Sequence, residues 1–357
     1  MNARLLVTGA GTGSGNNLIR SLRAGDPSLF IVGCHADRFV LKKSDADRSY
    51  LVPASKHAAF ADTLRRIIEA EQIDLLIPHS EVDVAAVSGF RERMPCRLFL
   101  PRQAVIDRCL DKYALTTFLQ AQGLPAPATY PVTDLDSLDE LFRKLEPHSR
   151  LWCRMRTGTA SMGAIPVTDV EQARSWIRYW ERMRGFPVTS FTVSEYLPGR
   201  DFSLQCLWKD GVLILAKMSE RLSYFGAGNH PSGMSSTPAL AKTVFEPRVV
   251  DVCTRAIRAL DARASGVFCF DLKENRDGVA CITEINAGRF AMITPIYDLV
   301  GRYNMAGTFV RLALGEPVDL REEYDVTLDY YLVRDLDTPP GIFHADELFE
   351  SIHRVAT

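Results

Sequence analysis

The chain has 357 residues, of which 46% are hydrophobic and 24% charged, and its 42 basic and 44 acidic side chains give a formal charge of −2. This composition is typical of a folded protein of two or three domains, and it excludes intrinsic disorder, collagen and coiled coil. The balanced charge argues against nucleic acid as a partner, because no basic surface is available to bind phosphates.

All apolar runs are far shorter than the roughly 20 residues that cross a bilayer. The first run, 5–7, gives way at once to Thr8-Gly9, so the apolar core of a secretory signal is missing. We therefore expect a cytoplasmic protein with no membrane partner. The 8 cysteines form no Cys-x-x-Cys pair, and several lie in apolar runs, so we expect them to be reduced and mostly buried.

Short apolar runs alternate with helical patterns over the first hundred residues. Strands are predicted at 5–7, 30–32, 74–78 and 97–100, with an amphipathic helix at 58–71. This alternation predicts βαβ units, a parallel sheet and an α/β domain. Two further helices, at 102–109 and 111–122, precede Gly123-Leu124-Pro125, where a helix cannot continue.

The remainder of the chain has an α+β pattern of strands and glycine loops. Strands are predicted at 151–155, 189–196, 202–208, 212–218, 267–273 and 279–286, and helices at 137–145, 170–183, 249–259 and 304–314. The segment after Pro339-Pro340-Gly341 is too short to form a domain.

A glycine-rich loop, 8–15, lies between the first predicted strand and a helix. Glycine amides and a helix N-terminus can cradle a phosphate or carboxylate, but the same loop can be a tight turn with nothing bound. Both interpretations stay open. The spacing also fits short-chain dehydrogenases, which would imply a nicotinamide cofactor. No tyrosine in the chain is followed four residues later by lysine, however, and that pair is expected in such enzymes.

The segment 264–290 carries the strongest chemical signal. Asp277-Gly278 is typical of a two-residue hairpin turn, with Arg276 facing Val279. Continuing this register pairs Asp271 with Glu284.

The same register pairs Cys269 with Asn286. Asp271, Glu284 and Asn286 then share one face of the hairpin, with paired Cβ atoms roughly 5 Å apart. Oxygen donors at this spacing suit Mg²⁺, which in enzymes usually accompanies phosphates, and Mn²⁺ could replace it. A solvated charged hairpin is the alternative, but the apolar neighbours on both strands argue against it.

Asp271 followed thirteen residues later by Glu284-Ile285-Asn286 resembles the ATP-grasp superfamily, which includes D-alanine ligases, biotin carboxylase and the carbamoyl phosphate synthetase large chain. The resemblance implies a Rossmann-like preATP-grasp domain at 1–110, a small lobe with a glycine-rich flap at 111–190, a large lobe with the metal site at 191–335, and a C-terminal tail at 336–357.

Three upstream motifs match the superfamily in order, over 5 to roughly 314 of the chain. Glu195-Tyr196-Leu197 is similar to the hinge that binds adenine, and Asp201 to the carboxylate that holds ribose. Arg154 and the glycine-rich segment with Gly158, Ser161 and Gly163 are similar to the strand and flap that contact the triphosphate. Lys112 matches the first phosphate-contacting lysine.

The sequence also departs from the superfamily pattern. Arg154-Met155 stands where Lys-Pro is usual, so the second phosphate contact would be a guanidinium. Asp201 replaces the usual glutamate, and Arg289 lies one position later than in the commonest pattern. These differences affect the expected geometry of the bound nucleotide and not the expected class of protein.

Three residues are candidates for substrate binding. Glu81 follows the strand near 75–77 at the edge of the sheet where ligands of α/β folds bind, and it could hold an amine. Arg289, just beyond the metal strand, could contact a transferred phosphoryl group or a carboxylate. Arg221 precedes a glycine-containing loop that could be a substrate flap or a plain surface loop.

The resemblance implies an ATP-dependent ligase that activates a carboxylate as an acylphosphate and joins it to an amine or a related nucleophile, with Lys112, Arg154 and Arg289 as catalytic residues. ATP and Mg²⁺ would be the cofactors, bicarbonate is one candidate acid, and a homodimer is compatible with the resemblance. The alternatives are an NAD(P)-dependent oxidoreductase and a nucleotide-binding regulatory protein without ligase activity.

Overall fold

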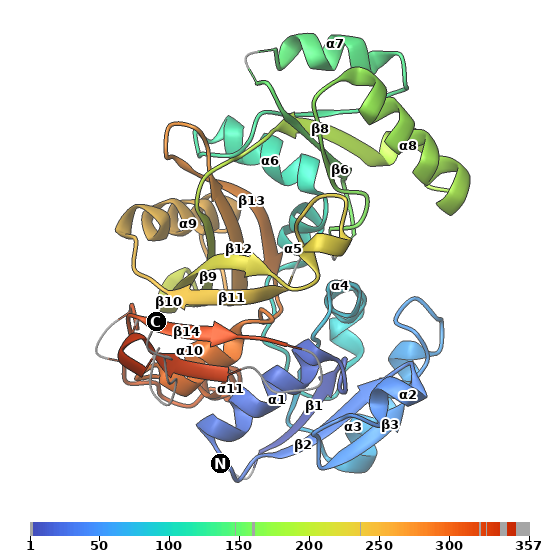
Figure 1. The fold of residues 1–357 in the computed structure, drawn as a ribbon. Helices are drawn as coiled ribbons and strands as arrows, with labels where there is room; N and C mark the ends of the chain where they lie inside the picture. Colours follow the sequence, from blue (N-terminus) through green and yellow to red (C-terminus); the bar gives the residue numbers. More distant parts are fainter. Residues whose placement is uncertain are drawn as a thin grey trace, which may run out of the picture.

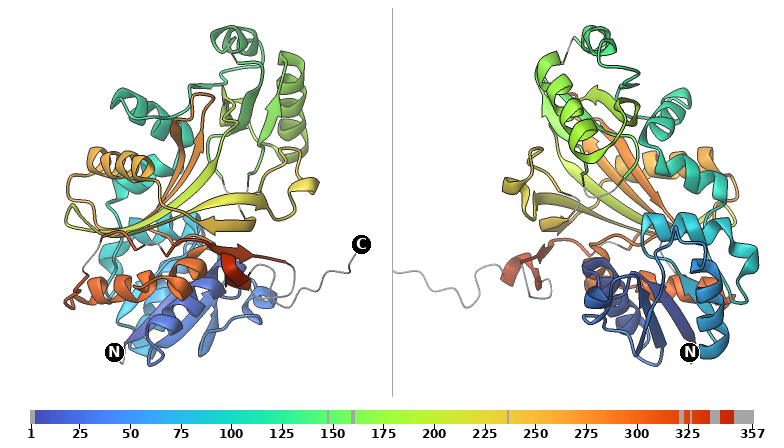
Figure 2. Two further views of the ribbon diagram at one scale, coloured as in Figure 1. Left: turned by 60° about the vertical axis from the view of Figure 1, so that its left-hand side comes forward. Right: turned by 90° about the vertical axis from the view of Figure 1, so that its right-hand side faces the viewer.

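Three sheets make up the protein, seen here in a computed structural model (Figure 1). The structure describes residues 3–146, 148–158, 161–235, 237–320, 323–325, 327–335 and 341–347. The N-terminal sheet lies at one end, a seven-stranded sheet in the middle and a second four-stranded sheet at the other end, in both views of Figure 2.

The N-terminal sheet is parallel, in the order β3-β2-β1-β4. Its strands are β1 (Arg4–Thr8), β2 (Phe30–His35), β3 (Arg48–Leu51) and β4 (Leu75–Ile77), and the associated helices are α1 (Gly13–Gly25), α2 (Arg38–Leu41), α3 (Phe60–Glu71) and α4 (Glu81–Gly89). The predicted α/β arrangement is confirmed. The strand expected at 97–100 is wrong: only Arg97 bridges to Leu75, because Phe99 turns into the core and Pro101 has no N–H to donate.

The central sheet is antiparallel, in the order β13-β12-β9-β10-β11-β14-β15. Its strands are β9 (Asp201–Lys209), β10 (Val212–Tyr224), β11 (Pro238–Thr243), β12 (Gly266–Glu274), β13 (Ala280–Ala287), β14 (Tyr330–Val333) and β15 (Gly341–His344). The last strand and the short 3-10 turn Ala345–Glu347 lie within the predicted tail 336–357, whose residues 336–340 and 348–357 fall outside the part of the chain that the structure describes.

Alternating residues divide the central sheet into two faces. Leu204, Phe268 and their neighbours on one face pack on α5 (Gln103–Leu110), α6 (Lys112–Ala121) and α9 (Pro247–Leu260). Residues such as Leu207 and Val267 on the other face pack on α11 (Met305–Leu314) and the N-terminal sheet, and α10 (Thr294–Val300) lies beside β14. Further along this second face, polar residues replace apolar ones and form the site described below.

The third sheet is antiparallel, in the order β5-β8-β6-β7, with α7 (Ser137–Lys144) and α8 (Val170–Arg184) packed on it. Its strands are β5 (Thr129–Pro131), β6 (Leu151–Met155), β7 (Ile165–Val167) and β8 (Phe191–Glu195). A boundary at residue 190 would divide this sheet, because β8 pairs with both β5 and β6.

The β12–β13 hairpin has the predicted pairing at its site end and a different turn. Asp271 pairs with Glu284 and Cys269 with Asn286, as predicted. The two-residue turn is wrong: Asn275 N–H bonds to Val279 O, which leaves a three-residue loop with Gly278 at φ +72°. A bulge then restores the predicted register.

The bulge is at Thr283. Asp271 pairs with Glu284 but Leu272 pairs with Ile282, so Thr283 is the additional residue of β13. Its hydroxyl donates to Asp271 O at 2.9 Å. The longer turn and the bulge offset each other, and the paired carboxylates therefore reach the same face.

An aromatic cluster joins the N-terminal sheet to the central sheet. Phe309 of α11 lies 5.3 Å from Phe99 and 5.1 Å from Phe290, measured between ring centroids, and it is 1% exposed. We expect Phe309→Ala to lower the free energy of unfolding by about 3–5 kcal/mol, as truncation of a fully buried aromatic ring typically does. Chemical denaturation would measure this, with Phe39→Ala, at a 78% exposed side chain, as the control that should change little.

Two sequence expectations concern the whole chain. Within the described residues, no helix has the length and apolar character needed to span a membrane. All eight cysteines are free, and every one except Cys96 is buried.

Candidate active site

A cavity of about 380 Å³ opens between the polar part of the central sheet, the third sheet and the carboxyl edge of the N-terminal sheet. Every candidate residue named from the sequence lines it except Gly163. They are Glu81, Lys112, Arg154, Gly158, Ser161, Glu195, Tyr196, Leu197, Asp201, Arg221, Asp271, Glu284, Asn286 and Arg289.

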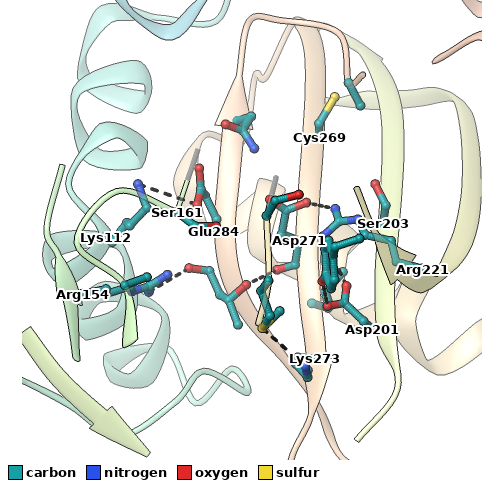
Figure 3. A pocket seen from close by; sticks show the side chains of 18 of the residues that line it. Lys112, Arg154, Ser161, Asp201, Ser203, Arg221, Cys269, Asp271, Lys273 and Glu284 are labelled. Carbon is teal, nitrogen blue, oxygen red and sulfur yellow. Dashed lines mark hydrogen bonds and ion pairs between the residues drawn. The ribbon is translucent and has the colours of Figure 1, made fainter. Parts of the chain in front are cut away.

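The three predicted metal ligands lie on the cavity face of the β12–β13 hairpin. Asp271 and Glu284 are labelled in Figure 3. The side chains of Asp271 and Glu284 are 28% and 19% exposed, and Asn286 is buried. They therefore combine two partly accessible carboxylates with one amide oxygen. No described group of three or more His, Cys, Asp or Glu side chains is placed to bind a metal.

Each of these oxygen donors faces a cationic side chain. Arg221 pairs with Asp271, and Lys112 Nζ lies 3.6 Å from Glu284 Oε2. Arg289 donates to Asn286 Oδ1 at 2.5 Å. The donor chemistry suits a hard divalent cation, and the surrounding cations compensate the carboxylates. A metal ion that bound Oδ1 of Asp271 would require Arg221 to release that oxygen.

Asp201 belongs to the same network. Arg221 Nη1 donates to Asp201 Oδ1 at 3.2 Å, and Tyr224 donates to its other oxygen. Burial raises the pKa of Asp201, and the Arg221 charge opposes that rise. Arg221 thus bridges the predicted ribose residue and a predicted metal ligand, and it lies on strand β10 rather than in a surface loop.

Lys112 and Arg154 approach the hairpin from the opposite side of the cavity (Figure 3). Lys112 Nζ donates to Gly158 O at 2.8 Å, so it contacts the start of the predicted flap. Arg154, on β6, donates to Thr283 O at 3.1 Å, while its Nε has no partner among the described residues. Burial lowers the pKa of Arg154, and the charges of Glu284 and Asp271 oppose that fall. A buried guanidinium with a free donor is suited to bind an anion.

The predicted flap is described at both ends, whereas Thr159 and Ala160 lie outside the described residues. Gly158 and Ser161 line the cavity. Gly163 does not, and it serves the packing of the flap: its φ is +68°, and a Cβ there would lie 2.7 Å from Met155 Cγ. Trp176 Nε1 donates to Gly163 O at 2.9 Å and anchors this end.

The predicted hinge lies at the end of β8. Glu195 accepts a hydrogen bond from Ala128 N–H at 3.2 Å, and His148 Nε2 lies 3.4 Å from its other oxygen. The ring of Tyr196 packs against Trp152 at 6.2 Å between centroids. Aromatic side chains that line a cavity suit the binding of a planar heterocycle.

At the opposite end of the cavity, Arg289 Nη2 lies 3.2 Å from Glu81 Oε1. Burial raises the pKa of Glu81, and the nearby Glu284 raises it further, while Arg289 opposes both. Glu81 begins α4 at the carboxyl edge of the N-terminal sheet, as predicted. The sequence thus placed residues 208 positions apart in one site.

The glycine-rich loop is a tight turn. Gly9 and Gly11 have φ values of +71° and +85°, and a Cβ on Gly11 would lie 2.0 Å from Val40 O. A Cβ on Gly15 would lie 2.2 Å from Gly9 O. Three glycines are therefore required by the backbone itself. Ser14, in the first turn of α1, nevertheless lines the cavity.

Several cavity residues were not singled out from the sequence. They include Ser14, His79, Trp152, Ser203, Tyr224, Lys273 and Thr283. Ser203 and Lys273 could have been found, because they alternate with the apolar residues of predicted strands and so share the face of Asp271. Tyr224 and His79 depend on contacts between distant elements, which no local pattern reveals.

Solved structures of other proteins have the same architecture. An L-amino acid ligase from Bacillus licheniformis matches with TM-score 0.69 and 15% identity, over 93% of this chain and 79% of the ligase. A biotin carboxylase in complex with β-γ-ATP from Campylobacter jejuni matches with TM-score 0.70 and 12% identity, over 92% and 74%. A carboxyaminoimidazole ribonucleotide synthase from Aspergillus clavatus, complexed with ATP, matches with TM-score 0.68 and 14% identity, over 93% and 82%.

The chain has the ATP-grasp fold. The fold expected from the hairpin and the upstream motifs is therefore confirmed. No protein-family model matches the sequence. The oxidoreductase alternative finds no support in these similarities. Asp271 and Glu284 line the cavity between the central sheet, the third sheet and the edge of the N-terminal sheet.

Proposed function

We propose that this protein is an ATP-dependent ligase that activates a carboxylate as an acylphosphate and joins it to an amine or a related nucleophile, releasing ADP and phosphate. The observation that carries the proposal is the pairing of Asp271 with Glu284 on the cavity face of the hairpin, opposite Lys112 and Arg154. The ATP-grasp fold and the ligases that share it support this assignment.

In this proposal the nucleotide extends along the cavity. Glu195, Tyr196 and Leu197 contact adenine, and Asp201 holds ribose. Lys112, Arg154 and the flap residues Gly158 and Ser161 contact the triphosphate. The small lobe then includes β8 and ends near residue 195, with the large lobe beyond it and the preATP-grasp domain at 1–110.

Asp271, Glu284 and Asn286 would hold Mg²⁺, which would neutralise phosphate charge when bound. The chain's own residues supply position and charge. Lys112 and Arg154 stabilise negative charge on the phosphoryl oxygens, Arg289 contacts an anionic group of a substrate, and closure of the flap excludes water from the acylphosphate. No covalent nucleophile of the protein is needed.

The direct test is ADP formation from ATP by the purified protein with Mg²⁺, across a panel of small carboxylic acids paired with amino acids and other amines. We expect ADP release that requires one acid and one nucleophile together and stops when EDTA removes the metal. Bicarbonate-dependent release would identify carboxyphosphate chemistry within the same proposal. Nucleotide binding without turnover for any pair would instead support a regulatory protein and would contradict ligase activity.

A further inference from the structure

The cavity extends beyond the nucleotide region into a crevice of the N-terminal sheet. In the order β3-β2-β1-β4, the chain passes from β1 to β2 on one side while β4 lies on the other. The carboxyl ends of β1 and β4 therefore form a topological switch point, where open α/β sheets bind ligands. Ser14, His79 and Glu81 line the cavity at this crevice.

His79, two residues beyond β4, is the unexplained residue of this crevice. It is 3% exposed, and neither ring nitrogen reaches a hydrogen-bond partner of normal geometry among the described residues. Most buried imidazoles are hydrogen-bonded, because an unpaired buried polar group costs stability. Because His79 lines the cavity, a bound ligand could supply the missing hydrogen-bond partner of its ring.

The charges around the His79 ring determine which ligand fits. Ser14 lies next to the ring in the first turn of α1, a helix of 13 residues whose N-terminus carries partial positive charge. The positive charge of Arg289 also acts on the ring, and Arg289 Nε has no hydrogen-bond partner in the described part of the chain. Burial and, to a smaller extent, the charge of Arg289 lower the pKa of His79 to about 4, although the Ser14 backbone opposes the fall. The ring is therefore neutral near pH 7 and offers one N–H donor.

Donors from three separate elements thus converge on one end of the cavity. We propose that His79, Arg289 and the first turn of α1 bind an anionic group, a carboxylate or a phosphate, of the second substrate, whose amine faces Glu81. The assignment of a second substrate rests on the proposed ligase function. The anion site itself does not, and it is tested without turnover.

The first experiment observes the histidine rings directly by ¹⁵N NMR of the full-length protein in the presence of MgADP. The His79→Asn spectrum identifies the His79 signals among those of seven histidines. We expect these signals to shift saturably with acetate or with phosphate, and the anion that acts identifies the class. Glycinamide, which has no anionic group, and chloride at equal ionic strength should cause no shift.

A second experiment distinguishes a binding role from a structural role. His79→Leu keeps the bulk of the side chain and removes the unpaired nitrogens, so it should leave the melting temperature unchanged or higher. It should weaken binding of the active anion about ten-fold or more, and His79→Asn, which keeps an N–H donor, should retain part of the affinity.

His35→Leu is the matched control, at the end of the neighbouring strand β2. Its ring Nδ1 already accepts from Asp37 N–H at 2.8 Å, so this substitution should lower the melting temperature and leave anion binding unchanged. The proposal is overturned if neither acetate nor phosphate shifts the His79 signals, if chloride shifts them equally, or if His79→Leu destabilises the protein without weakening anion binding. Absence of ligase turnover together with an anion-dependent shift would contradict only the proposed function.

Discussion

Glu284→Gln is expected to lower ATP turnover at least about 100-fold. The substitution keeps the size of the side chain but removes the charge that faces Lys112 at 3.6 Å and pairs across the hairpin with Asp271. Loss of a carboxylate from a magnesium site weakens both metal binding and stabilisation of phosphate charge. The measurement is the rate of ADP formation as a function of Mg²⁺ concentration, and we expect the Mg²⁺ requirement to rise as the rate falls.

Asp277→Asn is the matched control for this variant. Asp277 lies in the exposed turn of the same hairpin, so its substitution also removes one carboxylate while leaving the cavity intact. It should keep wild-type turnover and metal dependence. Glu284→Gln with normal turnover and an unchanged Mg²⁺ requirement would show that the hairpin carboxylates do not form the metal site.

Lys112→Met is expected to lower kcat/KM for ATP by about 100-fold, chiefly through weaker binding of the triphosphate. Lys112 is buried, contacts Glu284 and donates to Gly158 O at 2.8 Å, so it connects the metal carboxylate to the flap. Methionine fills a similar volume without the charge or the donor. Steady-state kinetics and calorimetric binding of a non-hydrolysable ATP analogue would measure the loss.

Lys144→Met provides the comparison, because Lys144 forms an exposed ion pair with Glu140 on α7, far from the cavity lining. Its kinetics should match those of the wild type. Normal binding of the ATP analogue by Lys112→Met, in protein with a wild-type melting temperature, would remove Lys112 from the nucleotide site.

In the β12–β13 hairpin, the predicted pairing of the site residues is correct although the predicted turn is wrong. The sequence predicts the pairing of Asp271 with Glu284, although the turn is one residue longer than Asp277-Gly278 suggests. The bulge at Thr283 compensates. The apolar residues at 280, 282 and 285 all face the helices behind the sheet. In a regular strand only every second residue would do so, and the step of three between 282 and 285 therefore indicates one additional residue in β13.

The predicted elements followed from apolar runs, and two of the missed strands have no such run. Strand β3 was not predicted because it lies at a sheet edge and none of its residues is fully buried. Strand β11 includes a proline and has only a partly buried pattern. The segment 97–100 shows the opposite error, since its apolar residues fill the core without pairing along a strand.

The sequence predicts which residues line the site better than it predicts the contacts that these residues make with one another. Motif order identified nearly all the charged groups that line the cavity. The pairing of Arg221 with both Asp201 and Asp271 was not predicted, because it depends on three neighbouring strands held in register. For the same reason, the unpaired ring of His79 became visible only when β4, α1 and Arg289 were placed together.

A crystal structure of the protein with Mg²⁺ and a non-hydrolysable ATP analogue tests the central claim most directly. We expect a metal ion bound by Glu284 and Asp271 at roughly 2.1 Å, the triphosphate in contact with Lys112 and Arg154, and Arg221 released from Oδ1 of Asp271. A nucleotide bound elsewhere, or one bound in this cavity while Arg221 still holds Asp271 and no metal contacts either carboxylate, would contradict it.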